Sequence, residues 1–85
     1  LWPQAAAAQA SNCAPYRDVV DHLASGWGEY LQTVSLTPDS TVLATFANTQ
    51  SGSWTMTVTD ANGTTCLIAA GTGFELVATP MGVPG

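Results

Sequence analysis

The hydrophobic pattern changes once along the chain, from a helical period of about 3.6 residues to the two-residue period of strands. Residues 12–25 carry the helical pattern, with apolar side chains at positions i, i+3, i+4 and i+7. Asn12 can cap this helix, and Gly26 is placed to end it. One amphipathic helix is therefore predicted near the N-terminus. Its core-facing stripe consists of Tyr16, Val19, Val20 and Leu23.

From Leu31 onward, apolar residues alternate with polar ones, and valine and threonine become frequent, as in strands. Strands are predicted over residues 41–47, 53–59 and 64–70, with a short edge strand over 74–77. In the strictly alternating segment 53–59, the larger apolar side chains are expected to point inward and the threonines outward. The inward set consists of Trp54, Met56 and Val58.

Short connections over residues 48–52 and 60–63 indicate that these strands are antiparallel neighbours. Residues 31–36 are either a first strand or the loop that leads from the helix to the sheet. The simplest fold that covers one sheet face is a two-layer α+β arrangement. We therefore expect one N-terminal helix packed on a three- to four-stranded antiparallel meander sheet.

A chain of 85 residues is long enough for one small domain. Residues 11–78 are predicted to form it, and residues 79–85 are expected to be a flexible tail rich in proline and glycine. Residues 1–10 resemble the end of a secretory signal peptide, with small residues suited to cleavage after Ala8 or Ala10. The alternative is an apolar N-terminal arm that docks on a partner. The signal-peptide interpretation predicts that the chain is exported.

Charge is scarce and almost entirely negative. The chain contains six acidic residues and a single arginine, which gives a net charge of −5. Nucleic-acid binding is not expected, because no basic patch exists to neutralise phosphates. No stretch approaches the roughly 18 apolar residues that a membrane span requires.

Cys13 and Cys66 are the two cysteines. An even number in a small exported chain predicts one disulfide, which would stabilise the fold by roughly 4 kcal/mol. Two buried free thiols are the alternative. A metal site is not expected, because two thiols and one histidine do not make a zinc pattern. The bridge would tie the helix to the sheet.

Catalytic chemistry has few candidate residues. Asp18, His22 and Ser25 fall on one helix face, but an exposed face lacks a pocket and an oxyanion hole. Asp18 and His22 could hold a divalent metal together, but two ligands do not close a site. The sequence therefore predicts no catalytic residue, no metal site and no cofactor.

The aromatic residues Trp27 and Tyr30 follow the predicted end of the helix. They are candidates for an exposed patch that contacts a ligand or a partner, since aromatic faces bind without needing charge. The alternative is that they anchor the turn from helix to sheet. Trp2 is a further candidate for partner contact if the N-terminal arm is retained.

Several short motifs lie between Cys13 and Glu75. They are Cys13-x3-Arg17 in the helix, Gly52-x-Trp54-Thr55 and Gly63-x-x-Cys66 in strands, and Ala70-Gly71-x-Gly73-Phe74-Glu75. Together they resemble a group of small exported alphaproteobacterial proteins of unassigned function. The resemblance implies a periplasmic or secreted location and a shared disulfide, and it implies no activity.

Arg17, the only cation in the chain, stands out in this resemblance. It could pair within the chain with Glu29 or Asp21, or contact a carboxylate of a partner as a further candidate contact residue.

These patterns favour a non-catalytic interaction module. It would be an accessory or structural subunit of a larger envelope or extracellular assembly, and would contact protein through a sheet edge or the apolar arm. The alternative is small-ligand or glycan binding through exposed aromatics near Trp27 and Tyr30. The sequence sets neither the partner nor the oligomeric state.

Overall fold

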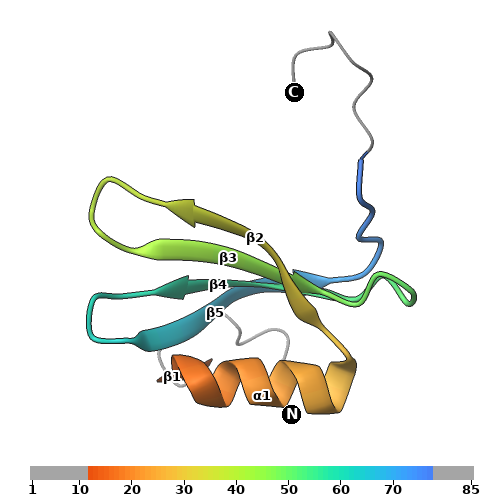
Figure 1. Ribbon diagram of the computed structural model, residues 1–85, viewed down its shortest axis with the longest axis horizontal. Coiled ribbons are helices and arrows are strands. Elements are labelled where there is room, and N and C mark those ends of the chain that lie inside the picture. Colours follow the sequence, from red (N-terminus) through yellow and green to blue (C-terminus); the bar gives the residue numbers. More distant parts are fainter. Residues whose placement is uncertain (1–11, 78–85) are drawn as a thin grey trace, which may run out of the picture.

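The chain folds as one helix packed on a five-stranded antiparallel sheet, in a computed structural model that describes residues 12–77 (Figure 1). The elements in chain order are β1 (Cys13–Pro15), α1 (Tyr16–Trp27), β2 (Tyr30–Leu36), β3 (Val42–Ala47), β4 (Trp54–Thr59) and β5 (Thr64–Gly71). Within the sheet the strands lie in the order β1-β5-β4-β3-β2. The predicted α+β class is confirmed, with five strands in place of three to four.

Both ends of the helix differ from the prediction. Pro15 has φ −57° and ψ 144°, an extended conformation, and a proline also disfavours helix in the residue before it. The segment from Cys13 to Pro15 therefore pairs with β5 as a strand, and the helix begins at Tyr16 instead of near Asn12. At the other end, the helix continues through Gly26 to Trp27.

Gly28 ends the helix. Its φ of 65° lies in the left-handed region, which glycine adopts without a steric penalty. The Gly28 N–H donates to the Ala24 carbonyl, and the Glu29 N–H donates to the Leu23 carbonyl. These two bonds satisfy carbonyls that the last helical turn would otherwise leave open.

The two edges of the sheet also differ from the prediction. The residues left undecided between strand and loop form β2, the edge strand beside β3. Residues 74–77 form no strand, so the edge strand predicted there is wrong. The Phe74 N–H donates instead to the Gly52 carbonyl, which holds this segment beside the turn before β4.

The core lies between α1 and one face of the sheet. Val19 and Leu23 are buried on the helix, Val20 packs at the margin, and the Tyr16 ring lies 6.4 Å from that of Phe46. Their buried partners on the sheet are Ala44, Phe46 and Leu67. Among the described elements, no helix or strand covers the opposite sheet face (Figure 1).

The predicted orientation of β4 is wrong. Thr55 and Thr57 lie on the helix side and are buried, whereas Trp54, Met56 and Val58 are half-buried on the opposite face. The register explains this reversal, because Thr57 pairs with both Ala44 and Leu67, which belong to the core. Threonine suits such a position because its methyl group packs and its hydroxyl can bond to a neighbouring group.

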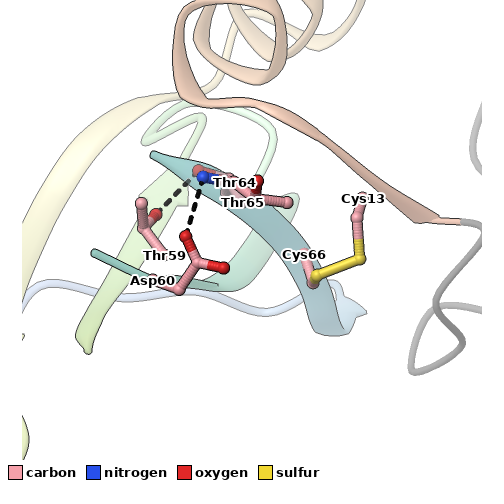
Figure 2. The surroundings of a disulfide bond; sticks show 6 residues. All are labelled: Cys13, Thr59, Asp60, Thr64, Thr65 and Cys66. Atoms are coloured by element: carbon pink, nitrogen blue, oxygen red, sulfur yellow. Dashed lines mark hydrogen bonds between the residues drawn. A yellow bond between two sulfur atoms is a disulfide. The ribbon is translucent and has the colours of Figure 1, made fainter. Parts of the chain in front are cut away.

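The disulfide between Cys13 and Cys66 is present, as predicted (Figure 2). The two residues face each other across β1 and β5, with their Cα atoms 4.0 Å apart. The bond therefore joins two strands of the sheet, and holds the helix only through the chain that leads to Tyr16. A hydrogen bond from the Tyr16 N–H to the Gly63 carbonyl also holds the chain where β1 ends and α1 begins.

Trp2 and the predictions for residues 1–10 and 79–85 lie outside the described residues. The described residues form no helix with the length and hydropathy needed to cross a bilayer.

Candidate functional site

Strand β2 presents an exposed, uncharged edge. Its residues hydrogen-bond on one side to β3, and within the described sheet no strand pairs with the other side. Val34 and Leu36 are 59% and 78% exposed, although both are large and apolar. Sheet edges are commonly protected by charge, proline or shortness, and the seven residues of β2 have none of these. This edge is therefore open to pairing with another strand.

The hydrogen bonds of the β2–β3 hairpin show which backbone groups face outward. The Thr37 N–H donates to the Thr41 carbonyl at 2.9 Å. Bonded and non-bonded residues alternate along an antiparallel pair. Ser35 therefore bonds to β3, whereas Val34 and Leu36 turn their N–H and C=O groups toward the open edge.

The usable part of this edge has clear limits. The register of β2 shifts between Leu31 and Thr33, so Gln32 is an extra, bulged residue. Its side-chain amide donates back to the Tyr30 carbonyl at 3.1 Å. After the strand, Pro38 has no N–H to donate. The regular open edge therefore runs from Thr33 to Thr37.

The opposite edge, β1, is much less able to pair. It has three residues, the last of which is Pro15. A strand this short that ends in proline offers few backbone donors, which is how many proteins block an edge. Of the two outer strands of the described sheet, β2 is therefore the one suited to pairing with another strand.

A shallow depression of about 370 Å³ lies beside the start of β2. It is lined by Gly28, Tyr30, Gln32, Ala47, Asn48, Thr49 and Gln50, none of which is charged. The Asn48 side chain is already engaged, because it donates to the Trp27 carbonyl and accepts from the Gln50 and Ser51 N–H groups. The Tyr30 ring, 61% exposed, is the large side chain of the depression.

The predicted site residues do not form one cluster. Tyr30 lines the depression, whereas Trp27 is exposed nearby and contributes only its carbonyl, to Asn48. Arg17 lies near the other end of α1, about 15 Å away along the axis at the usual helical rise. It is exposed, and it makes no ion pair with any residue from 12 to 77.

Glu29, one predicted partner of Arg17, is buried instead. Its carboxylate accepts a hydrogen bond from the Thr55 hydroxyl at 2.7 Å. This bond links the turn after α1 to the middle of the sheet. Asp21, the other predicted partner, is exposed on the helix.

The residues weighed as a catalytic set, Asp18, His22 and Ser25, all lie on α1. The Ser25 hydroxyl donates to the Asp21 carbonyl at 2.7 Å, which directs it along the helix. His22 is half-buried and Asp18 is exposed. Within residues 12–77, no three histidine, cysteine or acidic side chains gather into a metal-type cluster.

Asp39 closes the turn between β2 and β3. The Thr37 hydroxyl and then the Thr41 hydroxyl donate to its carboxylate, and these bonds lower the pKa of Asp39 below its usual value. The turn therefore places one ionised carboxylate just beyond the end of the open edge.

Sequence reasoning predicted a sheet edge as a contact surface, but did not identify Val34 and Leu36. The available signal was the absence of charge across residues 30–37, immediately before Pro38. This absence of charge indicates a contact surface only when the strand is known to lie at an edge of the sheet.

Comparisons with protein-family models, with curated proteins and with solved structures find no match for this chain. The resemblance to small exported alphaproteobacterial proteins therefore stays a prediction.

Proposed function

We propose that the protein is a non-catalytic interaction module, an accessory or structural subunit of a larger envelope or extracellular assembly. It binds another polypeptide chain, which adds a strand to the edge of β2. The observation that carries this proposal is the open edge from Thr33 to Thr37, with its exposed, uncharged and apolar side chains. Strand addition of this kind obtains affinity from backbone bonds and specificity from alternate side chains.

The chemistry of the added strand follows from the edge. Its backbone must be extended to meet the outward groups of Val34 and Leu36. Apolar side chains at alternate positions would cover those two residues on the helix side of the sheet. The disulfide and the absence of a membrane-crossing helix among residues 12–77 are compatible with an exported protein, and we place the assembly in the periplasm or outside the cell.

Site-specific photocrosslinking tests the proposal. A photoreactive phenylalanine analogue is placed at Leu36 or, as a control, at Leu76, which is similarly exposed at 68%. We expect position 36 to crosslink to an extended segment of a polypeptide, and a second substitution, Val34→Pro, to abolish that crosslink. Equal yields from positions 36 and 76, or a crosslink that survives Val34→Pro, would contradict strand addition at β2.

The depression beside Tyr30 favours a second candidate function, the binding of a neutral glycan. An exposed aromatic ring surrounded by amide and hydroxyl groups fits an uncharged sugar ring. Titration with neutral oligosaccharides, followed by NMR, should shift resonances of residues 28–32 and 48–50, and Tyr30→Ala should remove those shifts. Tyr16→Ala, at a partly exposed tyrosine outside the depression, is the control.

A further inference from the structure

We infer that the chain added to β2 is a second copy of this protein. Two β2 strands pair antiparallel about a two-fold axis at Ser35, and the two sheets become one continuous sheet. This inference rests on the proposed use of the β2 edge, and it names the partner.

The backbone selects the register. Centring the pair on Ser35 places Val34 opposite Leu36 of the second copy, so all four outward-facing residues exchange their N–H···O bonds. Centring it on Val34 would place Leu36 opposite the bulged Gln32. Centring it on Leu36 would place Val34 opposite Pro38, which has no N–H. Only the register centred on Ser35 therefore pairs the outward N–H and C=O groups of both Val34 and Leu36.

The side chains fit the same register. A two-fold axis perpendicular to the sheet keeps the helix faces of both copies on one side. The exposed Val34 and Leu36 of each copy then cover their counterparts, which removes apolar surface from water. On the other face, Ser35 meets its own copy. That pair is non-hydrogen-bonded, with Cα atoms about 4.5 Å apart, and a small side chain suits this approach.

Charge permits this contact between identical molecules. Each copy carries a net charge of −5, so two copies repel over most of their surfaces. The edge itself has no charged residue, and the nearest acid along the chain, Asp39, lies beyond its end. In the register centred on Ser35, Asp39 falls opposite the uncharged Leu31 of the other copy. The contact therefore brings no two carboxylates face to face.

The expected dimer is reversible. A few residues of edge bury much less than the about 800 Å² per partner of a standard stable interface. The fraction of dimer should therefore rise with protein concentration.

Sedimentation of the full chain over a range of concentrations tests the inference. We expect the mass to rise from 8.7 kDa toward twice that value. Val34→Pro should remain at 8.7 kDa, because it removes an outward N–H and no bond to β3. Val77→Pro, at an exposed valine outside the strands, should dimerise like the natural chain. A natural chain that stays monomeric, or a Val34→Pro variant that dimerises equally well, would overturn the inference.

A cysteine placed on the two-fold axis gives a second test, which does not depend on the folding of Val34→Pro. Under mild oxidation, Ser35→Cys should give a disulfide-linked dimer in high yield, since the geometry matches that of the Cys13–Cys66 pair. Ser25→Cys, on the exposed helix face, should give little. Equal yields would overturn self-pairing. If β2 crosslinks only to a different polypeptide, self-pairing fails while the proposed function stands; if it crosslinks to no chain, both fail.

Discussion

At the scale of single residues, Gly28 shows how one backbone conformation determines the position of the open edge. It ends α1 in the left-handed region, two residues before β2 begins at Tyr30. A Cβ atom at this position would lie 2.8 Å from the side-chain nitrogen of Asn48, which itself bonds to the Trp27 carbonyl. The direction in which β2 leaves the helix therefore depends on a residue without a side chain.

Gly28→Ala should destabilise the protein by about 1–2 kcal/mol, since alanine is strained at positive φ and its methyl group would displace Asn48. Chemical denaturation would measure the change in the free energy of unfolding. Gly26→Ala is the matched control, because a Cβ atom there meets nothing within 4 Å and alanine favours a helix. That control should be neutral or stabilising, and a similar loss in both variants would contradict this account.

Asp39 gives a pH-dependent prediction. Hydrogen bonds from the hydroxyl of Thr37, and to a lesser extent from that of Thr41, lower the pKa of Asp39 in the folded protein. The stabilisation that these bonds give to the ionised carboxylate is therefore fully present above the unfolded pKa of about 3.9. It is lost as pH falls through the lower, folded pKa. An NMR titration should place the Asp39 midpoint below that of an unfolded aspartate, and Thr37→Val should raise it. Thr49→Val, in a different turn, should leave the midpoint unchanged.

At the scale of the elements, the alternating pattern predicted the strands β3, β4 and β5 but not the face that the helix covers. Alternation shows that the two faces of β4 differ. It does not show which face is covered, because threonine has both a methyl group to pack and a hydroxyl to bond. The position of β2 at an edge also depends on the order of strands, which arises from pairings between distant segments. The open edge could therefore be predicted as a kind of surface but not as particular residues.

Two threonines of β4 provide a matched test of this buried polar face. The Thr55 hydroxyl donates to the buried Glu29 carboxylate at 2.7 Å, whereas the Thr57 hydroxyl has only a long contact of 3.5 Å with the Ala44 carbonyl. Thr55→Val should cost about 1–3 kcal/mol of unfolding free energy, because it leaves a buried acceptor without its donor. Thr57→Val should lower it by less, because the one hydrogen bond of that hydroxyl is long and the added methyl group stays in an apolar environment. Equal losses in thermal or urea unfolding would show that the Glu29 bond is not the cause.

At the scale of the whole molecule, the disulfide stabilises a small domain that has only a small hydrophobic core. The bond joins residues 53 positions apart, which removes much of the freedom of the unfolded chain. Replacing Cys13 and Cys66 together by alanine should lower the free energy of unfolding by about 2–4 kcal/mol. Urea unfolding of the double variant and of the oxidised natural chain would measure this. A change below about 0.5 kcal/mol would mean that the sheet and helix alone set the stability.

The asymmetry of the two sheet edges has a consequence for growth. A sheet with two open edges can add molecules at both ends and extend into a filament, which is the hazard that exposed strands carry. Here β1 is three residues long and ends in Pro15, and Cys13 holds it against β5. Pairing through β2 therefore leaves β1 as the outer strand at both ends of the joined sheet. The disulfide-anchored β1 therefore opposes growth of the joined sheet beyond two molecules.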